Sequence, residues 1–253
     1  MSEDRIREVF DLVRECQDCA FKKRGFTFYA DHASGYKYML ILQNPLWNPK
    51  RYKEEKEKAE QARDLEQRVR VHQGYMLRWF LSRNERFIIR FLDLCKKYRL
   101  IEYGNPRTYI EDRRFFEDFY VTDLIKYWCK TQEIKDEHLR HAIDHLATEV
   151  DAVKPNLAFV FGTRVWETFQ DRFHPEPCQE LTGIDPERGD NRVSNVHSYL
   201  FSSVSKSIGH KFFVIPLAHM SERARYMLLR DSYFEYLEDG LRCFSSLALE
   251  RVG

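Results

Sequence analysis

The run YKYMLIL at residues 36–42, followed at once by Gln43, Asn44 and Pro45, is the stretch that decides the fold. The run is short, apolar and bounded by turn-forming residues, which is typical of a buried β-strand. A strand that only turned back would end in Gly, Asn or Asp, whereas this one ends in two amides followed by proline. We therefore interpret Gln43 and Asn44 as the rim of an active site at the end of a strand.

Three further apolar runs predict strands at residues 119–123 (FYVTD), 157–161 (LAFVF) and 211–217 (KFFVIPL). Segments with helical spacing separate them, and the clearest covers residues 136–153. Four apolar strands separated by helices predict an α/β fold of three layers, in which helices flank a central four-stranded parallel sheet.

Each predicted strand ends in polar residues. These residues are Gln43 and Asn44, Thr122 and Asp123, Gly162 and Thr163, and the group His219, Met220 and Ser221. Ligands of parallel α/β folds bind at the carboxyl ends of the strands. The agreement among the four strand ends therefore predicts one site along that edge of the sheet.

The remaining segments predict a single domain over residues 1–253, with a helical insertion at about 50–115. Residues 50–70 are almost all charged or strong helix formers, which is typical of a solvent-exposed helix, and Gly74 is expected to break it. Residues 174–210 are rich in Pro, Gly, Ser and Asn, so we expect a loop there.

Composition limits the class of protein. No apolar run approaches the ~20 residues of a membrane helix, and the charged, amphipathic N-terminus is unlike a secretory signal, so we expect a cytoplasmic protein without a membrane partner. The net charge of +1 neither indicates nor excludes a nucleic-acid partner, because a local basic surface would decide that.

Several motifs follow one another along the chain. They are Cys16-x-x-Cys19, the strand that ends at Gln43-Asn44-Pro45, Thr122-Asp123-x-x-Lys126, Val153-Lys154-Pro155 followed by Phe161-Gly162, and His219-Met220-Ser221. In order and spacing they resemble the uracil-DNA glycosylase superfamily, most closely its iron–sulfur-type family, over roughly residues 1–50 and 115–240. The resemblance implies a monomeric, monofunctional DNA glycosylase of base-excision repair, a hydrolase that flips a base out of the duplex and cleaves the bond between base and sugar.

The resemblance also implies roles at the strand ends. Asn44 would position the attacking water, and His219 would hydrogen-bond the base oxygen on which negative charge develops. Gln43 would bind the base, and Tyr75, or less favourably Trp47, would stack on it. The residues alone leave other interpretations open: a turn-capping amide for Asn44, a surface histidine for His219, and core packing for both aromatic residues.

Contacts to the DNA backbone are implied in the same way. Ser221 would contact one phosphate, and Gly162 and Thr163 would present N–H groups at a helix start to another. Lys126 belongs to the same DNA-binding set. Arg223 would fill the gap that the flipped base leaves.

Asp123 departs from the family, which usually has asparagine here to read the uracil edge. An ionised aspartate has only acceptors, so it would repel O4 of uracil and accept from the exocyclic amine of cytosine. Three interpretations stay open: removal of cytosine or a modified cytosine, a protonated Asp123 that still reads uracil, or a loss of activity. A modified cytosine of bacteriophage DNA would indicate antiviral defence, and a loss of activity would leave a nucleic-acid-binding protein.

The cysteines suggest a metal site. Relatives with the N-terminal Cys-x-x-Cys bind a 4Fe–4S cluster through four cysteines, and Cys16 and Cys19 fit the first two positions. Cys129 lies near the third position, and the fourth is an alanine flanked by His141 and His145. Three cysteines and one of these histidines could hold a cluster or zinc, and free thiols are the alternative. The chemistry itself would need no metal.

Overall fold

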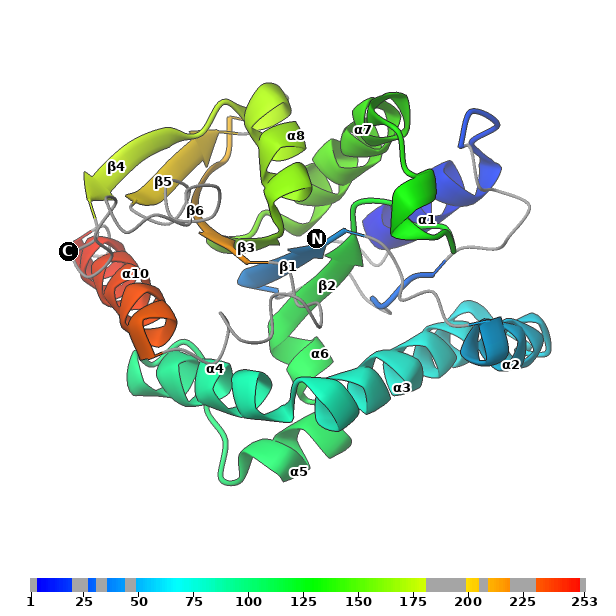
Figure 1. The fold of residues 1–253 in the computed structure, drawn as a ribbon, viewed down its shortest axis with the longest axis horizontal. Helices are drawn as coiled ribbons and strands as arrows, with labels where there is room; N and C mark the ends of the chain where they lie inside the picture. Colours follow the sequence, from blue (N-terminus) through cyan, green and yellow to red (C-terminus); the bar gives the residue numbers. More distant parts are fainter. Residues whose placement is uncertain are drawn as a thin grey trace.

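The computed structural model describes seven stretches of the chain. They are residues 4–19, 27–30, 36–43, 49–180, 199–204, 209–218 and 231–250. The described strands form one six-stranded sheet, and helices cover both of its faces (Figure 1).

The centre of the sheet is the predicted parallel part. Strands β1 (Tyr38–Leu42), β2 (Phe119–Asp123), β3 (Leu157–Phe161) and β6 (Lys211–Leu217) pair in parallel as β2-β1-β3-β6. Apart from the first residue of β6, every residue of these strands is buried, because helices lie on both faces. The prediction of a three-layer α/β fold with four parallel strands is confirmed.

Two antiparallel strands extend the sheet beyond β6. Strand β5 (Tyr199–Val204) pairs with β6, and β4 (Glu176–Glu180) pairs with β5. The prediction of a loop over residues 174–210 was wrong for these two segments. Antiparallel strands toward the edge of a sheet can have one solvated face, so they carry no continuous apolar run that a sequence pattern would reveal.

Three helices cover one face of the sheet. They are α1 (Asp4–Glu15), α7 (Asp136–Val153) and α8 (Thr163–Phe173), drawn above the sheet in Figure 1. Met39 and Ile41 of β1 pack into this layer together with Ala158 and Val160 of β3. The alternation of side chains along a strand sends the residues between them to the opposite face.

The opposite face is covered largely by the segment that we predicted as an insertion. The helices on this side are α3 (Leu65–Arg83), α4 (Glu85–Lys97), α5 (Pro106–Glu111), α6 (Phe115–Asp118) and the C-terminal α10 (Asp231–Glu250). The core here is aromatic: the rings of Phe91 on α4 and Phe159 on β3 lie 5.0 Å apart, edge to face. Much of this segment therefore packs against the sheet and contributes to the hydrophobic core on this face.

The charged segment forms two helices instead of one. Helix α2 (Pro49–Glu60) packs against α3, and the Asp64 carboxylate caps α3 by accepting from the Gln67 N–H at 2.8 Å. The prediction that Gly74 breaks the helix was wrong, because α3 continues through Gly74 to Arg83. The helices are not fully solvated either, since Glu55, His72 and Gln73 are buried. Among the described residues no helix combines the length and apolarity that a bilayer crossing requires.

Candidate functional site

Gln43 and Asp123 are neighbours at the carboxyl ends of β1 and β2. Leu42 is in register with Asp123 at the ends of the two strands. The chains stay paired just beyond this point, because the Leu124 N–H donates to Leu42 O at 2.7 Å and the Ile125 N–H donates to Gln43 O at 2.9 Å. The strand pairing therefore fixes the two backbones side by side.

Both side chains are buried and incompletely hydrogen-bonded. Gln43 is 6% exposed and Asp123 is 1% exposed. Within the part of the chain that the structure describes, Gln43 Nε2 and Asp123 Oδ1 have no hydrogen-bond partner. Buried polar groups in folded proteins are nearly always satisfied, so these two atoms at adjacent strand ends are candidates for contact with a polar ligand.

The other oxygen of Asp123 is occupied. Asp123 Oδ2 accepts a hydrogen bond from the Tyr29 hydroxyl at 3.0 Å. Burial raises the pKa of Asp123 to about 7, although the Lys126 charge and the Tyr29 hydroxyl act in the opposite direction. Both the protonated and the ionised form of the carboxyl are therefore accessible near neutral pH. It can present either an acceptor or a donor at Oδ1.

Lys126 follows β2 in the chain and its side chain is buried inside the protein. Its side chain is 3% exposed, and its ammonium pairs with Glu149 Oε1 at 2.7 Å and donates to Thr122 Oγ1 and Asp123 O. Thr122 Oγ1 in turn donates to Glu149 Oε2 at 2.6 Å. The ammonium thus has internal partners, and its predicted contact to DNA stays a prediction.

Gly162 and Thr163 stand where β3 gives way to α8. Gly162 has a φ of 103°, which favours glycine, and its N–H donates to Leu217 O at 2.7 Å. Thr163 is the first residue of α8, so this helix begins at the same edge of the sheet as Asp123. The position suits the predicted contact to a phosphate, although the Gly162 N–H already has a partner.

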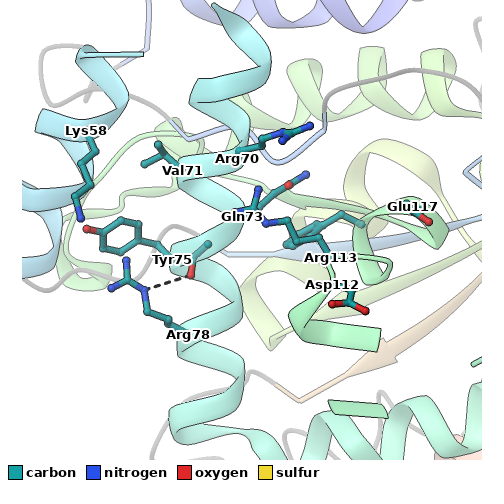
Figure 2. A pocket seen from close by; sticks show the side chains of 11 residues that line it. Lys58, Arg70, Val71, Gln73, Tyr75, Arg78, Asp112, Arg113 and Glu117 are labelled. Carbon is teal, nitrogen blue, oxygen red and sulfur yellow. Dashed lines mark hydrogen bonds between the residues drawn. The ribbon is translucent and has the colours of Figure 1, made fainter. Parts of the chain in front are cut away.

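Tyr75 is a buried residue of α3, with 7% of its surface exposed. It lines an open hollow of about 620 Å³ between α2, α3 and the chain after α5, and the Arg78 guanidinium covers its ring at 4.0 Å (Figure 2). In Figure 2 the side chain of Tyr75 points toward Lys58 on one side of α3. The side chain of Gln73 lies on the other side of the same helix. The predicted stacking of Tyr75 on a base is not tested by this arrangement. The aromatic residue that contacts Asp123 is Tyr29, which the motifs did not indicate.

Five of the residues to which the resemblance assigns a role lie outside the described residues. These are Asn44, Trp47, His219, Ser221 and Arg223. Their roles stay predictions from the sequence. The described strand ends nevertheless bring Gln43, Asp123 and Gly162 to one edge of the sheet.

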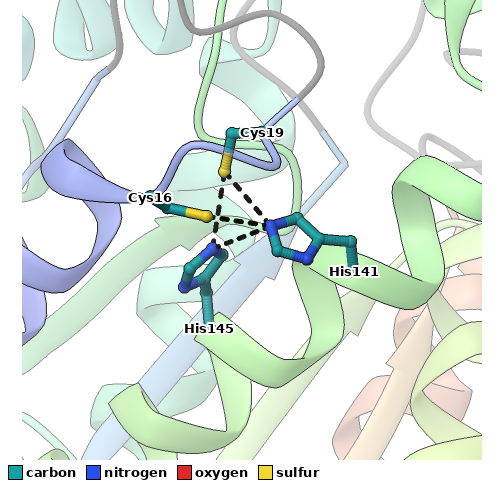
Figure 3. A group of neighbouring side chains, drawn as sticks. All are labelled: Cys16, Cys19, His141 and His145. Atoms are coloured by element: carbon teal, nitrogen blue, oxygen red, sulfur yellow. Dashed lines mark hydrogen bonds between the residues drawn. The ribbon is translucent and has the colours of Figure 1, made fainter.

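A second cluster joins the N-terminal cysteines to α7. Cys16 and Cys19 follow α1, and His141 and His145 stand one turn apart on α7, with all four ligand atoms within 4.8 Å of one another (Figure 3). His141 Nε2 lies 3.1 Å from Cys16 Sγ, 3.4 Å from Cys19 Sγ and 3.3 Å from His145 Nε2. His145 Nε2 lies 3.4 Å from Cys19 Sγ. Both histidines, and not one of them, accompany the cysteines.

These distances match a tetrahedral metal site. With metal–nitrogen bonds of about 2.0 Å and metal–sulfur bonds of about 2.3 Å, two nitrogens lie about 3.3 Å apart and a nitrogen and a sulfur about 3.5 Å apart. Burial, together with the neighbouring His141, lowers the pKa of His145 to about 4, so its ring is neutral at pH 7. Cys129 is buried and is not one of the four residues of this cluster.

The comparison with protein families decides the relationship. A family model described as the uracil DNA glycosylase superfamily matches residues 72–242. The chain belongs to the uracil DNA glycosylase superfamily. The match includes β2, β3 and β6 together with Asp123 and Gly162, and it begins after the Gln43-Asn44 motif. No curated protein matches the chain.

Membership of this superfamily carries two coarse conclusions. It indicates DNA glycosylase activity in general, which is hydrolytic, and it indicates DNA as the macromolecule acted on. The match also covers residues 72–115, a part of the chain in which the motifs gave no resemblance.

Proposed function

We propose that this protein is a DNA glycosylase that receives a flipped pyrimidine base between Gln43 and Asp123 and hydrolyses its N-glycosidic bond. The observation that carries the proposal is the pair of buried, unpartnered atoms, Gln43 Nε2 and Asp123 Oδ1, at adjacent strand ends among the described residues. A pyrimidine edge presents hydrogen-bond donors and acceptors to such a pair. The superfamily relationship supports the same chemistry.

In the proposed reaction water replaces the base on the sugar. The C1′–N1 bond breaks, and its electron pair leaves with the base. A water oriented by Asn44 bonds to C1′ and loses its proton, and the proton balances the charge of the departing base. Gln43 Nε2 donates to a base oxygen, and His219 stabilises the negative charge that develops on the base. No step requires a metal.

Asp123 determines which pyrimidine fits. An ionised carboxylate accepts at Oδ1 from the exocyclic amine of cytosine or of a 5-substituted cytosine. A protonated carboxyl donates from Oδ1 to O4 of uracil. A pKa near 7 supports both forms of Asp123, so we propose both uracil and a modified cytosine as substrates. A preference for bulky modified cytosines would support a role in defence against bacteriophage DNA.

The first prediction concerns base release and its dependence on Asn44. We expect the protein to release uracil or a modified cytosine from double-stranded oligonucleotides, and Asn44→Ala to lower the rate by about 100-fold or more because the water loses its orientation. The substrates are oligonucleotides with uracil, cytosine, hydroxymethylcytosine or its glucosylated form, scored by alkali cleavage at the abasic site.

Asn48→Ala is the matched control, because it removes another asparagine side chain from the same short segment. Both variants should keep the DNA affinity of the wild type. If the wild type binds DNA but releases no base, the proposed glycosylase activity is wrong and the protein is an inactive nucleic-acid-binding member of the superfamily.

The second prediction is a pH dependence set by Asp123. The groups that act on its carboxyl are the Tyr29 and Thr27 hydroxyls, the Lys126 ammonium and the Glu149 carboxylate. Because the pKa of Asp123 is raised to about 7, the ionised form gains as pH rises through 7. Release of an amine-bearing base should therefore increase over that range, and release of uracil should decrease. Rate profiles of wild type and Asp123→Asn test this, since the variant should lose the step near pH 7.

We further propose zinc as the occupant of the cluster of Cys16, Cys19, His141 and His145. Two thiolates and two imidazoles are a common donor set for structural zinc, whereas a 4Fe–4S cluster usually has four cysteines. Zinc held there would supply no chemistry. It would join the end of α1 to α7.

A further inference from the structure

Tyr29 is held in place from two directions. On one side, Gln73 of α3 is buried and its Nε2 donates to Tyr29 O at 2.8 Å. On the other side, the Thr27 N–H donates to Lys126 O at 2.8 Å, which ties this segment to the chain that follows β2. These two hydrogen bonds fix the backbone of residues 27–29 near the end of β2, where Asp123 lies.

The neighbours of Gln73 strengthen this anchor. The ring of His72 meets the Tyr29 ring edge to face, with centroids 6.5 Å apart. His72 Nδ1 lies 2.7 Å from Glu55 Oε1 of α2, and both side chains are buried. Helices α2 and α3 thus supply a polar, buried support behind Tyr29, and this explains why a helix pair of such charged composition buries polar side chains.

The Tyr29 hydroxyl makes the two oxygens of Asp123 different from each other. Oδ2 receives the Tyr29 hydroxyl, and Oδ1 lacks a partner within the described ranges. A carboxyl group with one oxygen fixed cannot rotate freely, so it offers the ligand a single oxygen in a defined direction. Without the Tyr29 hydroxyl, the carboxyl would keep the smaller contribution of the Thr27 hydroxyl and could tilt to suit an amine or a carbonyl.

We propose that Tyr29 is a positioning residue for base selection, which orients Asp123 so that Oδ1 alone reads the base. The inference rests on the proposed function, in which Asp123 contacts the base. Tyr29 precedes the residues that match the superfamily, whereas Asp123 and Gln73 lie within the match. The support from Gln73 gives the α3 segment a role in specificity.

The first test follows the Asp123 carboxyl itself. Infrared difference spectra against Asp123→Asn identify its band, and its titration is compared in wild type and Tyr29→Phe. The Tyr29 hydroxyl stabilises the ionised form, so its removal should raise the midpoint by about one pH unit. Tyr109→Phe is the matched control, because the Tyr109 hydroxyl donates to the Asp118 carboxylate at 2.6 Å at the other end of β2. An unmoved midpoint in Tyr29→Phe overturns the proposal.

The second test measures selectivity. Tyr29→Phe should reduce the ratio of kcat/KM between an amine-bearing and a carbonyl-bearing base by about tenfold, while Tyr109→Phe leaves the ratio unchanged. A merely structural role for Tyr29 would lower stability and leave both the ratio and the midpoint unchanged. Gln73→Leu removes the donor to Tyr29 O and should shift both quantities in the same direction by a smaller amount.

The proposed function and the role of Tyr29 can be refuted separately. If the wild type releases no base, the proposed function falls. If the wild type releases a base but Tyr29→Phe keeps the selectivity of the wild type, only the role of Tyr29 falls, whatever happens to the titration.

Discussion

Cys19→Ser is expected to remove zinc from the protein and to lower its free energy of unfolding by several kcal/mol. Structural zinc contributes an apparent ~10–16 kcal/mol in zinc-finger peptides, and the effect is smaller where a large core already stabilises the fold. The serine hydroxyl is a poor substitute for a thiolate, so three ligands would remain. Elemental analysis of the purified protein and its thermal unfolding give the two readouts.

Cys129→Ser and Cys243→Ser are the matched controls. Both replace a buried cysteine, and neither residue belongs to the four-residue cluster, so zinc content and the unfolding temperature should change far less than in Cys19→Ser. If Cys129→Ser loses the metal, the ligand set predicted from the sequence, three cysteines and one histidine, is correct instead. If the wild type contains iron and inorganic sulfide instead of zinc, the site holds an iron–sulfur cluster.

The region that zinc would stabilise is the contact between α1 and α7. Val9, Phe10 and Val13 of α1 pack in the same core layer as Leu146 and Val150 of α7. Helix α1 spans 12 residues, too few for a stable isolated helix, so it depends on tertiary contacts. A metal bridge at its C-terminal end would fix α1 on the sheet, and hydrogen exchange after metal removal should therefore increase first in this helix.

The four central strands could be predicted because burial on both faces imposes continuous apolar runs. LAFVF at 157–161 is such a run, and the structure buries all of it. Strand β4, with the sequence EPCQE, has no apolar pattern, and its pairing depends on β5 instead of its own composition. A local sequence pattern also fails for α3, which continues through Gly74. The packing of α3 against α2 and α4 stabilises the helix by more than a glycine in its interior destabilises it.

The site was predictable where a motif marks a strand end, and not where contacts join distant segments. Asp123 could be identified because it ends an apolar run and carries a polar side chain. Tyr29 stands in TFYA at 27–30, which carries no motif, and its partner Asp123 lies 94 residues away. For the metal cluster, the resemblance indicated His141 and His145 because they flank the alanine at the fourth ligand position, but only the course of α7 brings both to the cysteines.

Lys126 shows the difference between a charge in the sequence and its environment in the fold. Its position after Thr122 and Asp123 suggests a contact to DNA, but the described contacts of its ammonium are internal. An ion pair out of reach of water loses hydration on both sides. Each partner then depends on the other, because the charge that is left alone is buried without compensation.

Lys126→Met is therefore expected to destabilise the protein by about 3–5 kcal/mol, the usual cost of removing one partner of a buried ion pair. The reason is Glu149, which is 0% exposed and would keep its charge without a counter-ion. For a chain of this length each kcal/mol corresponds to about 2–4 °C, so the unfolding temperature should fall by about 6–20 °C.

The double variant Lys126→Met with Glu149→Gln separates charge from packing. The glutamine removes the uncompensated charge and can still accept from Thr122 Oγ1, so the double variant should recover much of the loss. Lys97→Met breaks an exposed pair with Glu238 and should leave the unfolding temperature almost unchanged. If Lys126→Met behaves like Lys97→Met in unfolding but weakens DNA binding, the ammonium faces the DNA and the internal pair is incidental. If it unfolds early and the folded fraction binds DNA as the wild type does, the motif that suggested a DNA contact marks the support beneath the base-reading residue.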